Sequence, residues 1–372
     1  GSAIVAKTLG EGDRARANRY FSMLVYTTAV VGVVLAVVGE LCLPFLSAML
    51  GAEGAMLQDC ILYGRIILAA LPAFMLQNVF QSFLITAEKA RLGLAVTVAA
   101  GLTNMVLDFV FIVPLGWGLA GAAIATAISQ AIGGVAPVLY FARKNDSLLR
   151  LTKAKLEGRI LLRTCTNGSS ELMSNISASI VTMLYNFQLM RLAGEDGIAA
   201  YGVVMYVNFI FAAIFIGYSI GAAPVIGYHY GAQNHAELKN LFRRSLVLVV
   251  ISGVVMTALA ELLAQPLTHI FVGYDAALYA LTVRGFMLYS LSFLVSGVNI
   301  FGSAFFTALN DGFVSAAISF LRTLVFQVAV VLLLPLILGI DGIWLAIVAA
   351  ELLALAVTLV FFIVKRKQYH YL

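Results

Sequence analysis

The segment VGVVLAVVGEL at residues 31–41 returns as SGVVMTALAEL at residues 252–262, an offset of 221. The same offset aligns further stretches without a gap, and the matched positions include Asn, Glu and Pro as well as apolar residues. Apolar residues often match by chance, but a shared register of rarer residues indicates an internal repeat. The recurring polar and proline pairs include Glu40 with Glu261, Asn78 with Asn299, and Pro114 with Pro335.

The repeated segments have the composition of membrane spans. Hydrophobic residues make up 62% of the chain and charged residues 11%, against about 45–50% and about 25% in soluble proteins. Apolar runs of about 20 residues can cross a bilayer, and backbone in hydrocarbon must bond to itself. We therefore predict an all-α integral membrane protein, a polytopic helical bundle. Complete spans are expected near 20–44, 60–87, 91–114, 117–142, 162–190, 198–228, 243–268, 279–308, 312–337 and 341–364.

The basic residues alternate from loop to loop. One set of connections contains clusters such as Lys89 with Arg91 and Arg243 with Arg244, and the other set contains almost none. The positive-inside rule assigns the basic loops, and with them the C-terminus, to the cytoplasm. Because orientation explains the net charge of +5, we expect no nucleic-acid partner.

The second copy of the repeat holds six predicted spans. An even number keeps both copies in the same orientation, as in transporters built from parallel repeats. We predict two parallel six-helix repeats, with an N-terminal lobe at residues 1–142, a cytoplasmic linker at 143–161 and a C-terminal lobe at 162–372. Subtracting the offset places about one and a half helices before residue 1. The first repeat is therefore expected to be incomplete, in an N-terminally truncated fragment of a twelve-span parent.

A polar stripe follows the span that begins near residue 162. Its members are three or four residues apart, so they share one helical face. Glu171 is predicted to lie near the middle of the bilayer. Placing a charged side chain there costs at least about 2.5–3.5 kcal/mol, so Glu171 needs a partner or a functional role. We interpret Glu171 as a functional residue on a face turned to protein or a water-filled cavity. The stripe consists of Asn167, Glu171, Asn175, Ser179, Thr182 and Asn186.

Polar residues in other spans suit a cavity on the repeat axis. The candidates for lining a substrate cavity are Asn78 and Ser82 in the first copy, and Ser179, Asn208 and Ser296 in the second. Equivalent helices of two halves that offer hydrogen-bonding groups would meet the needs of such a cavity. The alternative, especially for Ser and Thr, is hydrogen bonding between helices, worth about 0.6 kcal/mol each.

Two further charges lie at similar predicted depths in neighbouring spans. These are Arg322 and Glu351, and their equivalents in the first copy are the uncharged Gly101 and Gln130. Because both charges are absent together from the first copy, we predict a structural ion pair between Arg322 and Glu351. A pair between Arg322 and Glu171 is the rival interpretation.

Signals for other chemistry are weak. The three cysteines, Cys42, Cys60 and Cys165, are scattered and odd in number, and the histidines lie in loops or at the terminus without metal-ligand spacing. No phosphate-binding loop, zinc motif or nucleophile elbow occurs in the sequence. We therefore expect no enzymatic activity, no cofactor and no metal site.

Several stretches resemble the multidrug and toxic compound extrusion (MATE) family. Residues 101–130, GLTNMVLDFVFIVPLGWGLAGAAIATAISQ, resemble its fifth and sixth helices. LGEGDRARANRYFS at 9–22 and YHYGAQNHAELKNLFRRS at 228–245 resemble the loop signature after its second and eighth helices. The resemblance covers the whole chain. SELMSNISASIVTMLYN and NIFGSAFFTALNDG look most like the bacterial MepA-like branch.

The resemblance implies two lobes around a central cavity, alternating access, and export of amphiphilic, often cationic compounds driven by inward Na⁺ or H⁺. Glu171 matches the acidic position of the seventh family helix that is associated with cation coupling. The acidic position of the tenth helix has no carboxylate here, because residues 296–299 read SGVN. A Na⁺ site would use hard oxygen ligands, which Asn175, Tyr206 and Asn299 could supply beside Glu171. A proton site needs only Glu171, and the residues alone do not choose between the two ions.

We therefore expect a cation-coupled antiporter whose partners are small-molecule substrates and the lipid bilayer. It is expected to be a monomer and a multi-pass protein of the inner (plasma) membrane of a bacterium. The rival is a lipid-linked oligosaccharide flippase of the related two-lobe fold, which should carry several deep Arg or Lys residues for pyrophosphate, whereas only Arg322 is deep. A membrane-embedded enzyme or receptor is disfavoured by the repeat and by the lack of a catalytic constellation.

Overall fold

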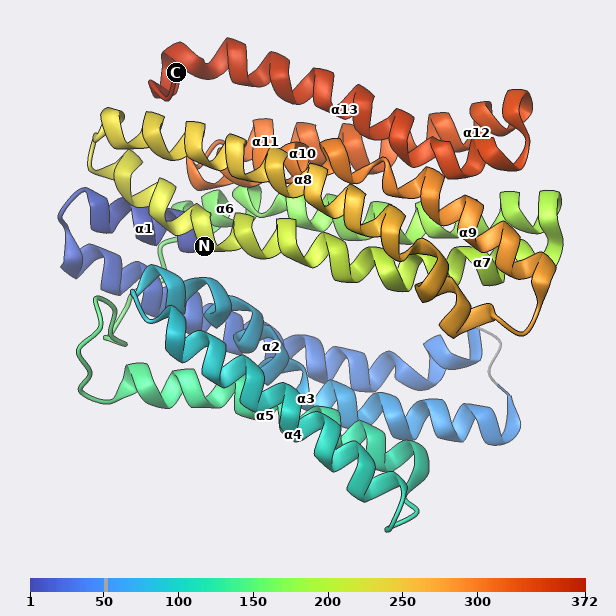
Figure 1. Ribbon diagram of the computed structural model, residues 1–372. Coiled ribbons are helices and arrows are strands. Elements are labelled where there is room, and N and C mark those ends of the chain that lie inside the picture. Colours follow the sequence, from blue (N-terminus) through green and yellow to red (C-terminus); the bar gives the residue numbers. More distant parts are fainter. Residues whose placement is uncertain (50–52) are drawn as a thin grey trace. The chain divides into compact units, whose positions relative to one another are not determined.

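The computed structural model describes residues 1–49 and 53–372, and every regular element in these residues is a helix (Figure 1). Eight of the helices are long and apolar enough to cross a membrane, or nine when one bent pair is counted as a single span. The predicted all-α membrane fold is therefore confirmed. The chain divides into two compact units, Gly1–Leu161 and Leu162–Leu372.

The first unit is built from long helices joined by short connections. Its helices are α1 (Ser2–Gly10), α2 (Arg14–Met49), α3 (Gly54–Thr86), α4 (Ala90–Ile112) and α5 (Gly118–Ala142). Aromatic rings form the centre of its core. The ring centroid of Phe21 lies 4.9 Å from that of Phe83 and 5.0 Å from that of Phe141, in edge-to-face contacts. Such rings join α2, α3 and α5 through large apolar surfaces.

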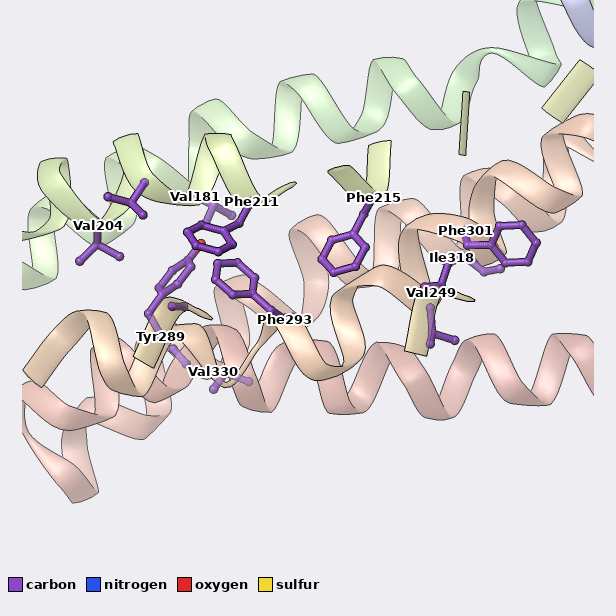
Figure 2. Packing of buried hydrophobic residues seen from close by; sticks show 14 of the residues in the cluster. Val181, Val204, Phe211, Phe215, Val249, Tyr289, Phe293, Phe301, Ile318 and Val330 are labelled. Carbon is purple, nitrogen blue, oxygen red and sulfur yellow. The ribbon is translucent and has the colours of Figure 1, made fainter. Parts of the chain in front are cut away.

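The second unit has a larger core, which Figure 2 shows from close by. After α6 (Gly158–Asn167) come α7 (Ser169–Gly231), α8 (His235–Val272), α9 (Ala276–Ser290), α10 (Phe293–Ala308), α11 (Gly312–Phe320), the π-helix η1 (Leu321–Phe326), α12 (Gln327–Leu338) and α13 (Ile340–Tyr369). Phe211 of α7 stacks on Phe293 of α10 with 5.2 Å between ring centroids (Figure 2). Their burial ties the second half of α7 to α10.

The 63-residue α7 contains two spans rather than one. Gly194 has φ 63° and ψ −148°, which is not helical and is a conformation open to glycine because it lacks a Cβ. The residues on either side, 169–193 and 195–231, are each long enough to cross the bilayer. Counting them separately, and α9 with α10 as one bent span, gives ten passes within the described residues. These passes match the ten ranges predicted from the sequence.

The helix boundaries of the two units repeat with the same offset of 221. α1 ends at Gly10 and α7 ends at Gly231, and the next helices begin at Arg14 and His235. Both connections also contain a residue with positive φ at the equivalent position, Gly12 in the first copy and Gln233 in the second. The internal repeat is therefore a repeat of structure as well as of sequence.

The second copy departs from the first in two places. α3 is continuous, whereas its counterpart is bent by 49° between α9 and α10. α4 is α-helical throughout, whereas its counterpart contains η1 between α11 and α12. A π-helical turn carries poorer backbone geometry and often marks a functional position. Both irregularities lie in the copy that also carries Arg322 and Glu351.

The linker segment, defined here as residues 143–157, packs along α2. It has no regular structure, yet its backbone is bound at several points. The amide of Arg150 donates to Asn18 Oδ1 at 2.9 Å, and the amide of Thr152 donates to Ser22 Oγ at 2.8 Å. Polar side chains of α2 thus satisfy backbone donors that an irregular segment would otherwise leave without partners.

A cluster around Asp311 closes one end of the second unit. Asp311 accepts from the backbone amide of Val314 at 3.3 Å and from the Tyr369 hydroxyl at 2.8 Å, and it pairs with Lys365 at 3.2 Å. The turn between α10 and α11 contains no basic residue, whereas the other connections on the predicted cytoplasmic side do. Lys365 supplies the missing positive charge from α13.

Close packing of α3 against α5 generates a test of the fold. A Cβ at Gly134 would lie 2.3 Å from the carbonyl oxygen of Ala73, so Gly134→Val must push the helices apart. We expect a loss of about 1–3 kcal/mol, measured as a lower thermal unfolding midpoint in detergent. Gly101→Ala is the control, because nothing lies within 4 Å of a Cβ there and alanine stabilises a helix interior by about 0.5–1 kcal/mol. Equal losses in both variants would contradict this packing.

Candidate functional site

Glu171 lies in the first turn of α7. α6 ends at Asn167 and α7 begins at Ser169, so a one-residue interruption at Gly168 precedes the carboxylate. The backbone at Gly168 stays in the right-handed helical region, with φ −90° and ψ −2°. The Gly168 amide donates to the Thr164 carbonyl at 3.0 Å, and the Gly168 carbonyl accepts from the Glu171 amide at 3.2 Å. The interruption is therefore slight, and Glu171 follows it in the first turn of α7.

The Glu171 side chain is exposed on the second unit. Within residues 1–49 and 53–372, its carboxylate has no hydrogen-bond or ion-pair partner. It is also the only acidic residue of the predicted polar stripe. The carboxylate is therefore available to a cation or a proton without first breaking an internal bond.

The predicted polar stripe is divided between two environments. Asn167 is buried and its amide donates to the carbonyl oxygen of Thr307 at 2.9 Å, so it joins α6 to α10. Asn175 and Ser179 are exposed like Glu171, and each donates to a backbone carbonyl one turn earlier, at 2.8 and 3.4 Å. The exposed part of the stripe forms one polar face on the first half of α7.

The other expected cavity residues lie on several helices. Tyr206 is exposed and Asn208 half-buried on the second half of α7, and Ser296 is buried in α10. Asn78 and Ser82 belong to α3 of the first unit, where Asn78 is exposed and Ser82 half-buried. Asn78 also donates to the backbone carbonyl one turn earlier, at 2.9 Å.

Asn299 is bound to α13 rather than to Glu171. Its side chain is fully buried, and its amide nitrogen donates to Glu351 at both the carbonyl oxygen (2.9 Å) and Oε2 (2.7 Å). Its Oδ1 accepts from the Thr358 hydroxyl at 3.0 Å. In the described part of the chain no contact joins Asn299 to Glu171, and both ends of its amide are occupied.

Arg322 and Glu351 lie in contact within the second unit. Arg322 Nε donates to Oε1 and Oε2 of Glu351 at 2.9 and 3.0 Å, and Nη2 lies 2.7 Å from Oε1. The Glu351 side chain is 3% exposed and that of Arg322 is 20% exposed. The pair joins η1 to α13, so the rival pairing of Arg322 with Glu171 is not the one adopted.

Thr358 belongs to this network and was not singled out by the sequence. It lies two turns after Glu351 on the same face of α13, a spacing that places the two side chains in line. Tyr185 and Gln327 form a second buried polar contact, with 3.4 Å between hydroxyl and side-chain oxygen. Neither carries a recognisable sequence signal, because a tyrosine in an apolar helix usually serves in packing.

Several hydroxyl groups serve helix packing, as the alternative interpretation of Ser and Thr allows. Ser303 Oγ lies 2.9 Å from Ser315 Oγ and 2.8 Å from Ser319 Oγ. Thr307 Oγ1 lies 2.6 Å from Ser315 Oγ. These bonds fasten α10 to α11 and satisfy groups that lipid cannot.

A metal cluster is not formed by the residues that the structure describes. No group of three or more His, Cys, Asp or Glu side chains among them could hold a metal ion. Cys42, Cys60 and Cys165 are free and exposed. The two notable features of the second unit are thus an unpaired carboxylate on α7 and a fully bonded carboxylate on α13.

Comparison with known proteins identifies what this arrangement resembles. The model of the MatE family matches residues 1–110 and 172–333. Multidrug export protein MepA of Staphylococcus saprophyticus is 22% identical over 367 residues, which cover 98% of this chain and 80% of the relative. MepA of Staphylococcus haemolyticus is 23% identical over 316 residues, 84% of this chain and 69% of the relative.

Solved structures show the same fold. A MATE transporter in complex with MaL6 superposes with a TM-score of 0.94, at 22% identity over 99% of this chain and 83% of the other. An outward-facing multidrug resistance MATE family transporter superposes with a TM-score of 0.93, with the same identity and coverage. At this identity the likeness establishes the fold.

The Arg322–Glu351 pair generates a stability test. Glu351→Ala leaves the half-buried Arg322 guanidinium unpaired, and we expect a loss of about 3 kcal/mol, the lower end for a broken buried pair. The double variant Arg322→Met with Glu351→Leu removes both charges and is expected to recover most of that loss. Thermal unfolding in detergent of the wild type, the single variant and the double variant measures the loss and its recovery. A double variant no more stable than Glu351→Ala alone would argue against a structural pair.

Proposed function

The chain belongs to the MatE family of membrane transporters, and on this premise we propose that it exports amphiphilic, often cationic small molecules in exchange for an inward-moving cation. Members of this family are transporters rather than enzymes, and the chain is a multi-pass membrane protein. The staphylococcal relatives are multidrug export proteins, which supports a drug-like substrate class. Alternating access of the two repeats would move the substrate.

The observation that carries the coupling proposal is the free carboxylate of Glu171. It is exposed on a polar face of a membrane-spanning helix, and it has no partner within the described residues. Glu351, by contrast, is bound by Arg322 and Asn299. Of these two carboxylates of the second unit, Glu171 can take up and release a cation at lower cost.

Substrate contacts are proposed for the polar residues predicted from the sequence. Ser179 lies on the polar face with Glu171, and Asn208 and Ser296 lie on other helices of the same unit. Asn78 and Ser82 would contribute from the first unit. A few placed polar groups among apolar and aromatic side chains are typical of sites for amphiphilic ligands.

The contacts of the proposed ion ligands favour a proton over Na⁺. Asn299 is an unfavourable partner of Glu171 in a Na⁺ site because its side chain is held on α13 by Glu351 and Thr358. Asn175 and Tyr206 would remain as oxygen ligands in addition to Glu171, whereas a proton requires Glu171 alone. One charge that crosses the membrane gains about 2.3 kcal/mol per 100 mV, enough for a modest substrate gradient per cycle.

The proposed location is the inner (plasma) membrane of a bacterium. The relatives are bacterial proteins, and the positive-inside rule would place the basic loops and the C-terminus in the cytoplasm. We propose that the transporter acts as a monomer without a cofactor. The flippase alternative would need deep basic residues such as Arg322 to bind pyrophosphate, but Arg322 is already paired with Glu351.

Efflux of a fluorescent cationic dye from membrane vesicles tests this function. Na⁺ and pH gradients are imposed separately, and Glu171→Gln is compared with the wild type. We expect a pH gradient to drive efflux in the wild type, and Glu171→Gln to lose gradient-driven efflux because a neutral amide cannot exchange a cation.

Glu195→Gln is the matched control. It makes the same chemical change on an exposed residue of the same helix, next to the break at Gly194, and efflux should persist. Efflux driven by the Na⁺ gradient alone would identify Na⁺, rather than H⁺, as the coupling ion. Unchanged efflux in Glu171→Gln would remove Glu171 from the coupling mechanism, and no efflux in any variant would favour the flippase.

A further inference from the structure

The membrane span formed by α9 and α10 is broken in its middle. α9 has 15 residues and α10 has 16, and the two helices are bent by 49° where they meet. At this break the Ser292 amide donates to the Tyr289 carbonyl, three residues back, at 3.0 Å, instead of the four residues of an α-helix. Residues 276–308 contain no proline, the usual cause of a kink. Another interaction must therefore hold the bend.

Two hydroxyl groups bind the backbone at the break. Thr257 Oγ1 of α8 lies 3.4 Å from the Ser290 carbonyl oxygen and 2.9 Å from the Gly253 carbonyl oxygen. Ser290 Oγ lies 2.7 Å from Glu261 Oε1 and 2.8 Å from the Met287 carbonyl oxygen. A hydroxyl group has one proton, so each donates fully to one of its two acceptors at a time. Each thus has one acceptor on the neighbouring helix and a second in its own helix.

The first copy of the repeat has neither hydroxyl group and no break. With the offset of 221, Ala36 and Ala69 are the counterparts of Thr257 and Ser290. The equivalent span, α3, is one continuous helix even though it contains Pro72. The break therefore accompanies the hydroxyl groups rather than a proline.

The carboxylate at this level has a different partner in each copy. Glu40 of α2 pairs with Arg65 of α3 at 3.6 Å. Phe286 replaces that arginine in the second copy, and Glu261 instead accepts from Ser290, one turn closer to the break. The second copy has thus replaced an ion pair with a hydrogen bond at the break itself.

The helices approach each other at the same glycine in both copies. A Cβ at Gly253 would lie 2.8 Å from the Phe293 carbonyl oxygen, and a Cβ at Gly32 would lie 2.8 Å from Pro72 Cα. Phe293 and Pro72 are equivalent positions of the repeat. The same close approach accommodates a broken span in one copy and a continuous span in the other, so both forms fit one helix framework.

We propose that the break is a switch with two forms, and that Thr257, Ser290 and Glu261 hold the bent form. When these contacts between helices are released, both hydroxyl groups donate to carbonyls of their own helices, and the span becomes continuous like α3. Neither form leaves a buried hydroxyl group without an acceptor, which would be costly in hydrocarbon. Straightening would reorient α10, which carries Ser296, relative to α9. The switch is separate from the cation coupling proposed for Glu171.

Double electron–electron resonance between nitroxide labels at the two ends of the span tests the switch. The labels are attached through Ala280→Cys and Phe313→Cys, both exposed positions, after serine has replaced the free Cys42, Cys60 and Cys165. At about 1.5 Å per residue, straightening the 49° bend lengthens the distance between the labels by about 4 Å. We expect the labelled parent chain in lipid nanodiscs to show both distances.

Substitutions at the break should change the proportion of the two forms. Thr257→Ala with Ser290→Ala installs the residues of the first copy and should shift the distribution toward the longer distance. Glu261→Gln keeps an acceptor for the Ser290 hydroxyl and should leave the distribution unchanged, whereas Glu261→Leu should shift it as the alanine pair does. Thr282→Ala is the matched control, because this buried hydroxyl donates to the Leu278 carbonyl of its own helix at 2.7 Å, away from the break.

Three outcomes would overturn the proposal. A single short distance in the parent chain would identify a static break, even if the variants did not fold. An unchanged distribution in the alanine pair would remove the hydroxyl groups from the switch. An equal shift in Thr282→Ala would attribute the change to general loosening of α9 rather than to the contacts at the break.

Discussion

Hydrocarbon offers no hydrogen-bond partner to a peptide group, and the whole architecture depends on that constraint. It makes each crossing a helix, and it restricts interruptions to positions where the freed backbone groups can be satisfied. Gly194 turns the chain between two crossings, and Gly168 interrupts it just before Glu171. The same constraint decides which side chains can be polar and what they must contact.

Two carboxylates of the second unit show opposite solutions to that demand. Glu351 is buried and receives donors from Arg322 and Asn299, so its charge is compensated from within. Glu171 is exposed on a polar face and has no side-chain partner among the described residues. A bonded carboxylate holds helices together, whereas an unbonded one is free to exchange its partner. The proposed division between structural and coupling roles follows from this difference in contacts.

The sequence was sufficient for the fold because its signals are long and redundant. Apolar runs predict the spans, and the offset of 221 predicts the matching helix ends at Gly10 and Gly231. Finer features depend on contacts that no run reveals. The interruption at Gly168 and the π-turn η1 have no counterpart in the apolar pattern.

Prediction of the candidate site was more limited for the same reason. Asn299 reads as a cavity residue from its span, yet its rotamer and neighbours bind it to α13. The pair between Arg322 and Glu351 could be predicted from the sequence because the two residues lie at similar depths and both charges are absent from the first copy. The role of Thr358 depends on which face of α13 meets Asn299, which only the packed helices define.

The equivalent surfaces of α2 and α8 also bear on how a duplicated protein diversifies. Duplication gives a chain two copies of every surface, and only one copy needs to keep the original neighbour. Here α2 offers Asn18 and Ser22 as hydrogen-bond acceptors and holds the protein's own backbone, while α8 has Lys239 and Arg243 at the same positions, which can only donate. A change of a few side chains on an unchanged helix can thus reverse which partner the surface offers, donor or acceptor, while the helix itself keeps its place in the repeat.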